Sequence, residues 1–138
     1  MKSLRKSEFM MMKKKKVKEL IRKALKADDL EQINKLLLEY PSMIDEFPSE
    51  LNLYPDLAID DAVIAGVGVM EDELAGPVRV EDVVKSVIVD FRKNLNEIEL
   101  FSILDKIERQ GFIQKRGIGW VLTIKGSEVC DQTLSQLG

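Results

Sequence analysis

The stretch that most restricts the fold of this chain runs from Leu104 to Val129 and reads LDKIERQGFIQKRGIGWVLTIKGSEV. A helical pattern ends in it at Gly111, and glycine commonly ends helices because it adopts a left-handed backbone at little cost. FIQK and WVLT follow as short predicted strands, joined through Gly117-Ile118-Gly119. Thr123 is expected to cap one more helix, whose apolar positions are Val129, Leu134 and Leu137. This order predicts a mainly α-helical fold with a small β-hairpin that covers one end of a helical core.

A well-marked helix is predicted immediately before this hairpin. Asn96 can cap it, and Glu97 and Glu99 lie in its first turn, where the helix dipole favours anions. Its apolar residues recur at the helical period and are Leu100, Ile103, Leu104 and Ile107. The opposite side holds Ile98, Ser102, Asp105, Lys106 and Arg109. The spacing therefore predicts one buried and one solvent-facing side.

Two further helices with a short strand between them are predicted upstream. The first runs from about Asp56 to Ala75, and Gly76-Pro77 breaks it. The segment PVRV is expected to be the strand. In the next segment, Val80 to Asn94, one helical face carries Val83, Val84, Val87, Ile88 and Phe91. This favours a helix, although the β-branched residues leave a strand from Val87 to Val89 open.

Residues 1–55 are predicted to form a basic arm and a helical hairpin, followed by a second domain at residues 56–138. The first apolar stripe consists of Val17, Leu20, Ile21, Ala24 and Leu25. Asp28 or Asp29 can cap the next helix, and Pro41 ends it. Its stripe consists of Leu30, Ile33, Leu37 and Tyr40. Residues 41–56 carry three prolines and are expected to be a linker or an ordered surface loop.

Charge is divided unevenly along the chain, although the net charge is only −3. Residues 1–26 hold 11 basic and 2 acidic residues, whereas residues 27–76 hold 1 basic and 13 acidic residues. Residues 77–138 hold 9 of each. The arm and the acidic middle are expected to attract each other, within the chain or across a dimer, or else the arm contacts phosphates.

The composition disfavours several classes of site. The chain has no histidine, and its single cysteine, Cys130, can form neither an internal disulfide nor a cysteine-based zinc site. No cofactor or metal is therefore expected, and the chain is predicted not to be an enzyme. No apolar run is long enough to span a bilayer, and none follows the basic N-terminus as a secretory signal would require. These features predict a cytoplasmic protein that contacts no membrane.

Two local patterns imitate ligand sites. Gly66 and Gly68 match the first two glycines of a dinucleotide-binding loop, but Glu71 occupies the third position, where a carboxylate would face a pyrophosphate. We expect these glycines to lie at a tight contact between helices instead. Glu71, Asp72 and Glu73 are suitable ligands for a hard cation. Because consecutive residues point to different sides of a helix, a solvated helix end is the preferred interpretation.

The order of the predicted elements resembles that of the winged helix-turn-helix superfamily over roughly residues 57–138. The likeness is carried by GPVRVEDVV, ILDKIERQGFIQK and WVLTIKG, while Val80 to Asn94 is longer than the usual second helix. The resemblance implies a recognition helix from about Glu97 to Gln110, followed by a wing. It also implies a homodimeric, DNA-binding transcriptional regulator. Because winged helices also serve as protein-docking modules, a protein-interaction module without DNA binding is the alternative.

The resemblance implies specific contacts with double-stranded DNA. On the recognition helix these residues are Ser102, Lys106 and Arg109, which would face the major groove. On the wing they are Lys115 and Arg116, beside a glycine, where they would clamp phosphates.

Neighbouring residues bear on this prediction. Asp105, Glu97 and Glu99 are unfavourable near DNA phosphates and suit a protein-docking role better. Trp120 is expected to pack over the core beside Phe112, with stacking on a ligand or partner as the alternative.

Overall fold

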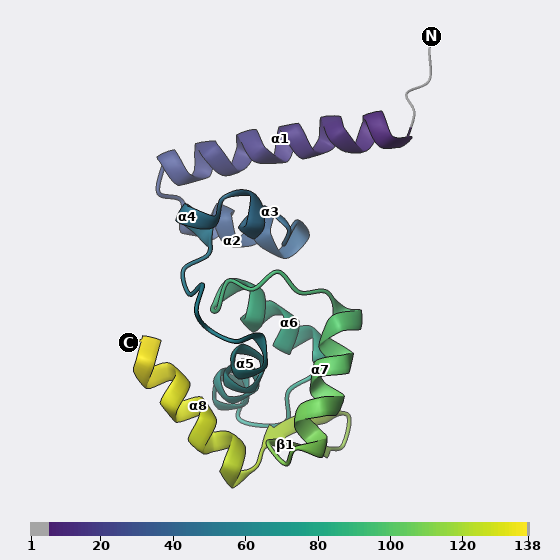
Figure 1. Ribbon diagram of the computed structural model, residues 1–138, viewed down its shortest axis with the longest axis vertical. Helices are drawn as coiled ribbons and strands as arrows, with labels where there is room; N and C mark the ends of the chain where they lie inside the picture. Colours follow the sequence, from purple (N-terminus) through teal and green to yellow (C-terminus); the bar gives the residue numbers. More distant parts are fainter. Residues whose placement is uncertain (1–5, 138) are drawn as a thin grey trace.

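The protein is mainly α-helical, with a two-stranded antiparallel hairpin close to its C-terminus (Figure 1). The computed structural model describes the backbone of residues 6–137 and the side chains of residues 13–137. In the N-terminal half the helices are α1 (Lys6–Lys26), α2 (Leu30–Glu39), α3 (Met43–Glu46) and α4 (Pro48–Leu51). The C-terminal half contains α5 (Ile59–Leu74), α6 (Val80–Val89), α7 (Glu97–Arg109), β1 (Ile113–Arg116), β2 (Gly119–Leu122) and α8 (Ile124–Leu137).

The predicted fold class is confirmed at the level of a mainly α-helical protein with a small hairpin before its final helix. The first five residues of the predicted basic arm lie outside the described range. Within the described residues, no helix combines the length and the apolar character needed to cross a membrane.

The predicted helical hairpin is formed by α1 and α2. Asp29 caps α2, since its side-chain oxygen accepts a hydrogen bond from the backbone N–H of Gln32 at 3.2 Å. Asp28 instead takes a φ of 53° in the turn. The buried residues of the two helices are Val17, Ile21, Ala24, Ile33, Leu36 and Leu37. The assignment of Leu20 and Leu30 to the buried stripes was wrong, because each helix is covered along only one narrow side.

Residues 41–56 are an ordered part of the N-terminal half. Pro48 begins α4, a position where the missing N–H of proline leaves no hydrogen bond unmade. Met43, Ile44 and Leu51 are buried in the same cluster as the buried residues of α1 and α2. The segment therefore completes the N-terminal core. It is ordered, as the second sequence interpretation expected, but it forms two short helices with buried residues and is not a surface loop.

Helix α5 is the centre of the C-terminal half, and it lies between α6 and α8 (Figure 1). A Cβ atom added at Gly66 would lie 3.3 Å from Cγ2 of Val87 in α6. One added at Gly68 would lie 2.5 Å from Sγ of Cys130 in α8. Both glycines sit inside a continuous helix, so they form no dinucleotide-binding loop. The predicted tight contact between helices is confirmed.

The segment after Gly76 differs from the prediction in its strand. Val78 makes a single bridge to Trp120, with backbone N···O distances of 2.9 and 2.8 Å. PVRV is therefore not a full strand, because Pro77 has no N–H to donate and α6 begins at Val80. Helix α6 continues to Val89, which confirms the helix over the alternative strand.

The residues after α6 attach the two halves to each other, and we call residues 92–94 the seam. Nη2 of Arg92 donates to Oδ1 of Asn34 in α2 at 3.3 Å. The other contacts join Lys93 Nζ to the Tyr54 carbonyl at 2.7 Å and Asn94 Nδ2 to Asp45 Oδ2 at 2.8 Å. The helix in the long segment Val80 to Asn94 has only 10 residues, and the additional residues make these contacts.

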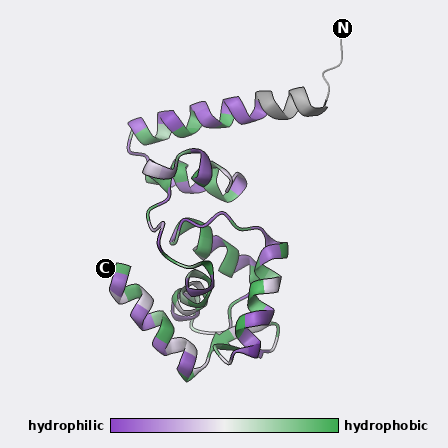
Figure 2. Ribbon diagram, viewed as in Figure 1, coloured by the Kyte–Doolittle hydropathy of each residue, from purple (hydrophilic) through white to green (hydrophobic). Residues whose placement is uncertain are grey.

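Each half has its own hydrophobic cluster, and α6 contributes to both. Ile88 packs with buried residues of α1 to α4, whereas Val83 and Val87 pack with those of α5 and α7. Figure 2 shows that the helices carry hydrophobic residues on some sides and hydrophilic residues on others. The predicted domain boundary at residue 55 stays a prediction.

The hairpin packs against the C-terminal core. Arg116 pairs with Gly119, which leaves a two-residue turn, and Gly117 in that turn has a φ of 63°, a value that favours glycine. Trp120 is buried in the core cluster, and Phe112 packs against the same cluster. The prediction that Trp120 packs over the core is confirmed.

Helix α8 begins as predicted but buries a different side. Oγ1 of Thr123 accepts from the N–H of Gly126 at 3.1 Å and donates to the carbonyl of Gly111 at 2.6 Å. The buried residues of α8 are Gly126, Cys130 and Thr133. Leu134 is exposed, so its expected place on the buried stripe was wrong. A Cβ at Gly126 would lie 1.9 Å from the Phe112 carbonyl oxygen, so small size rather than apolar character decides which side is buried.

Candidate functional site on helix α7

Helix α7 is fixed at both ends and along one side. The Asn96 side-chain oxygen accepts from the N–H of Glu99 at 2.8 Å, and the Asn96 amide donates to the Glu99 carboxylate at 2.7 Å. At the other end Gly111 has a φ of 85°, which lets the chain turn back into β1. The buried side consists of Leu100, Leu104 and Ile107. Helix α7 therefore presents its opposite side to solvent, as predicted.

The three predicted recognition-helix residues all lie on this solvent-facing side, but acids accompany both cations. Ser102, Lys106 and Arg109 are exposed. Nζ of Lys106 lies 2.5 Å from a carboxylate oxygen of Asp60 in the first turn of α5. Nη2 of Arg109 lies 3.0 Å from a carboxylate oxygen of Asp105. Part of the positive charge available to a phosphate is therefore already compensated.

The two predicted wing residues lie at the end of β1, and both are exposed. Nζ of Lys115 sits 5.3 Å from the centroid of the Trp120 ring, where a cation is attracted by the ring face. Arg116 lies next to the turn and lines a groove between the end of α5, strand β2 and α8. The hairpin therefore offers two exposed cations, in contrast to the charge-paired cations of α7.

Two large apolar side chains dominate the solvent-facing side of α7 near its N-terminus. Ile98 is 82% exposed and Phe101 is 54% exposed. The sequence prediction placed Ile98 on this side without a role and left Phe101 unassigned. In the same helical projection, Ile98 and Phe101 are the apolar residues outside the buried stripe, and this is the sequence signal that identifies them. Exposed aromatic and aliphatic groups on a rigid helix are typical of protein contact surfaces.

Acidic residues flank this apolar pair. Helix α7 holds four acidic and two basic residues, a net charge of −2. At 100° per residue, Glu97, Ile98, Phe101 and Asp105 share one side of the helix. We call these four residues the α7 patch: two apolar side chains with an acid at each end.

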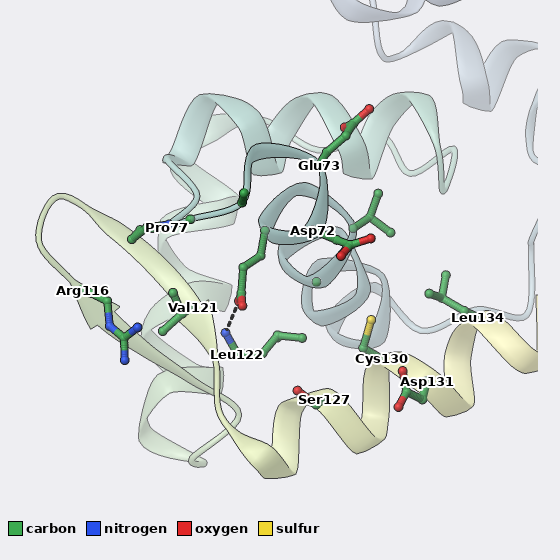
Figure 3. A pocket seen from close by; sticks show the side chains of 15 residues that line it. Asp72, Glu73, Pro77, Arg116, Val121, Leu122, Ser127, Cys130, Asp131 and Leu134 are labelled. Atoms are coloured by element: carbon green, nitrogen blue, oxygen red, sulfur yellow. Dashed lines mark hydrogen bonds between the residues drawn. The ribbon is translucent and has the colours of Figure 1, made fainter.

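A groove of about 880 Å³ lies between the end of α5, strand β2 and α8, and no sequence signal pointed to it (Figure 3). Its acidic residues are Glu71, Asp72, Glu73 and Asp131, and it is also lined by Arg116. Glu71 has a structural role, because its carboxylate accepts a hydrogen bond from the N–H of Leu122 at 2.8 Å. Among the described residues, no group of acids, cysteines or histidines is arranged to hold a metal ion.

Cys130 borders this groove but is a poor nucleophile. It is buried, and its Sγ lies 3.9 Å from the carbonyl oxygen of Ala65, to which the thiol donates. Burial raises the pKa of the Cys130 thiol, and Asp131 and Glu71 raise it further. The thiol is therefore protonated at neutral pH, and thiolate chemistry is disfavoured.

The basic helix α1 is partly neutralised by its neighbours. Lys14 and Lys18 both form ion pairs with Glu46 in α3, and their hydrogen bonds lower the pKa of the Glu46 carboxyl below 4.5. Lys13 lies over the ring of Tyr40 and Arg22 over that of Phe47, each 5.5 Å from the centroid. The expected attraction between the basic arm and the acidic middle thus operates within the chain.

Comparisons of this chain with protein-family models, with curated proteins and with solved structures found no match. The surface chemistry of the chain itself is therefore what indicates its function. Among the described residues, the surfaces that offer such chemistry are the α7 patch, the exposed cations of the hairpin and the basic side of α1.

Proposed function

We propose that residues 56–138 form a winged-helix domain whose α7 patch docks a protein partner. The order of elements supports the winged-helix assignment: α5, the Val78 bridge, α6, α7, the hairpin and α8 follow one another as that fold requires. The bridge between Val78 and Trp120 takes the place of the short first strand. In this assignment α7 is the recognition helix and the hairpin is the wing.

The observation that carries the docking proposal is the exposure of Ile98 and Phe101 between acids. Burying an apolar side chain of this size is worth roughly 1.5–3 kcal/mol. A partner that covers both would gain binding free energy from two neighbouring anchors, which is how a few residues come to dominate an interface. Binding to DNA would gain little free energy from these two side chains, because the major groove that would face them is polar and charged.

Charge supports the same proposal. Affinity for DNA comes largely from cations that displace counterions from phosphates. Helix α7 has a net charge of −2, and its cations are already close to Asp60 and Asp105. A partner with basic residues around an apolar anchor complements this surface better than a phosphate backbone does.

Site-specific photo-crosslinking tests this function in cells. A photoreactive amino acid at Ser102 should yield an adduct with one partner protein, and Phe101→Ser should abolish it. The same photoreactive residue at Lys35 in α2 is the positional control, and Leu74→Ser, which changes an apolar residue that is 50% exposed at the end of α5, is the substitution control. Adducts with DNA from Ser102, or an identical protein adduct from Lys35, would refute docking through α7.

The second candidate function is the DNA-binding transcriptional regulator, because Lys115 and Arg116 are exposed at the hairpin tip. If these residues clamp phosphates, changing both to alanine should weaken binding to all duplexes alike and reduce the log–log salt slope by about 2. If Arg109 reads a base, its neutralisation should cost about 1–3 kcal/mol for one sequence only. Fluorescence anisotropy with specific and scrambled duplexes at several salt concentrations measures both effects. Wild-type-like binding by all these variants would remove this candidate.

A further inference from the structure

We propose that the occupant of the α7 patch is helix α1 of a second copy of this chain, in a reciprocal homodimer. This inference rests on the proposed docking function of α7 and names its partner. It requires that α1 carry a surface complementary to the α7 patch in both charge and apolar character.

Helix α1 has such a surface on the side that does not contact α2. Val17, Ile21 and Ala24 are buried against the N-terminal half. On an adjacent side, Lys16, Leu20 and Lys23 are exposed, and Leu20 is 46% exposed. We call these three residues the α1 strip: an apolar side chain with a lysine at each end.

The two surfaces match in order and in length. Along the α1 strip, Lys16, Leu20 and Lys23 read basic, apolar, basic over about 10 Å at 1.5 Å per residue, and the exposed Glu19 lies at the edge of the strip away from the buried side. The α7 patch reads acidic, apolar, acidic from Glu97 to Asp105, about 12 Å by the same rise. Leu20 can therefore lie against Phe101 while the lysines reach the acids at the two ends. Opposite charges at both ends fix the register of two packed helices and oppose a slipped arrangement.

A contact between the α1 strip and the α7 patch has to join two copies of the chain. Helix α1 is fixed to its own chain by its buried side and by the ion pairs of Lys14 and Lys18 with Glu46. It lies across α2 at the opposite end of the molecule from the hairpin, and its N-terminal half extends beyond α2 on the side where α7 lies (Figure 1). The α1 strip is thus held apart from the α7 patch of the same chain and remains open to a neighbour.

A twofold axis would close the assembly. The α1 strip of each copy would pack on the α7 patch of the other. The dimer would therefore contain two equal contacts and would not extend into a filament. Two helix contacts also bury more surface than one, and stable interfaces bury about 1,200–2,000 Å² in total. The dimer would then cover the apolar pair that each isolated chain leaves in water.

Light scattering on the full chain is the first test. The wild type should have twice the chain mass of 15.7 kDa at tens of micromolar. Changing Ile98 and Phe101 together to serine should weaken dimerisation about 100-fold or more, because two anchors are lost in each of two contacts. Leu74→Ser is the matched control and should leave the dimer intact. Unchanged far-UV circular dichroism will show that each variant is folded.

Charge reversal provides the decisive test. Glu97→Lys with Asp105→Lys, and separately Lys16→Glu with Lys23→Glu, should each give monomers because like charges then meet. Mixing the two double variants should restore a dimer that contains one chain of each kind, since both contacts again join opposite charges. Lys35→Glu with Lys85→Glu, an equal charge change at exposed residues elsewhere, should still dimerise.

Three results would overturn the inference: a monomeric wild type, a dimer that tolerates the changes in both helices, or a mixture of the two double variants that stays monomeric. A protein adduct at Ser102 in cells that is not a second copy of this chain would leave the docking function standing while removing the homodimer. If the crosslinker at Ser102 captures DNA, both the docking function and this inference fail together.

Discussion

The two halves of the molecule differ in how far their large apolar side chains are exposed and in how their charged side chains are paired. In the N-terminal half, α1 to α4 enclose a cluster of buried side chains, and Glu46 holds two lysines of α1 by ion pairs. In the C-terminal half, Ile98, Ile118 and Ile124 are 79–84% exposed, whereas the exposed leucines of the N-terminal half reach at most 60%. Large apolar groups left in water cost free energy unless another surface covers them. The C-terminal half is therefore where a partner is to be sought, and the charged side of α1 is one surface that can supply it.

The connection between the halves is narrow. It consists of Ile88 and the partly buried Val84, which pack from α6 against the N-terminal cluster, and of the hydrogen bonds of the seam, among them that of Arg92 to Asn34. Changes inside one half and changes at this connection should consequently have different effects on unfolding.

The largest effect is expected from Gly126→Ala. The added Cβ would lie 1.9 Å from the Phe112 carbonyl oxygen, so α8 has to move away from the hairpin. Overpacking against a backbone atom should cost about 3 kcal/mol or more. Gly76→Ala is the matched control, because a Cβ there meets nothing within 4 Å. Chemical denaturation measures both, and a Gly126→Ala variant as stable as the control would contradict this account of α8.

Ile88→Ala should destabilise the protein by about 3 kcal/mol, since it removes a buried side chain that is 2% exposed. It should also separate the unfolding of the two halves, because this side chain carries much of their apolar contact. The unfolding curve should then broaden or split when fluorescence of Trp120 is compared with far-UV circular dichroism. Ile118→Ala, at a residue 79% exposed, should change stability by less than about 0.5 kcal/mol. A single, sharp transition for Ile88→Ala would mean that Val84 and the seam are enough to couple the halves.

Asn96→Ala should cost about 1 kcal/mol, as the loss of a side-chain cap typically does. The expected reason is the loss of both hydrogen bonds to Glu99, which leaves the first turn of α7 without its cap. Hydrogen exchange of the α7 amides should accelerate, while exchange in α1 and α2 stays as in wild type. Equal acceleration in both halves would show that the cap stabilises the whole molecule and not the C-terminal half alone.

The smallest effect should come from acidification of the N-terminal half. Hydrogen bonds from Lys14 and Lys18 lower the pKa of Glu46, so its ion pairs stabilise the folded state above the ordinary pKa of 4.5. This contribution is lost as the pH falls through the lowered folded-state pKa. Glu46→Gln should be slightly less stable than wild type at neutral pH and equally stable once the pH lies below that pKa. Thermal melts between pH 2 and pH 7 test this, and a constant difference at all pH values would exclude it.

The sequence by itself determined the features that depend on near neighbours. The helical period of Leu100, Leu104 and Ile107 identified α7 and its buried side, and Asn96 and Gly111 gave its two ends. These predictions succeeded because a cap or an apolar stripe involves residues at most four positions apart, whose geometry the helix itself fixes. The hairpin was found for the same reason, since the glycines between its strands are a local signal, although Gly119 belongs to β2 and not to the turn.

The tertiary structure decided which side of an element is covered where the apolar pattern is weak, and which charged groups from distant segments meet. Sequence periodicity assigned Leu134 to the buried side of α8, but the close approach of Gly126 to Phe112 buries a side with smaller residues. It also presented Lys106 as a free cation for DNA, whereas folding brings Asp60, 46 positions earlier in the chain, to 2.5 Å from it. The ion partner of a side chain is set by packing between distant segments, and so is the covered side of a helix such as α8, whose apolar residues do not form one clear stripe. A periodic pattern along one helix does not show which distant segment packs against it.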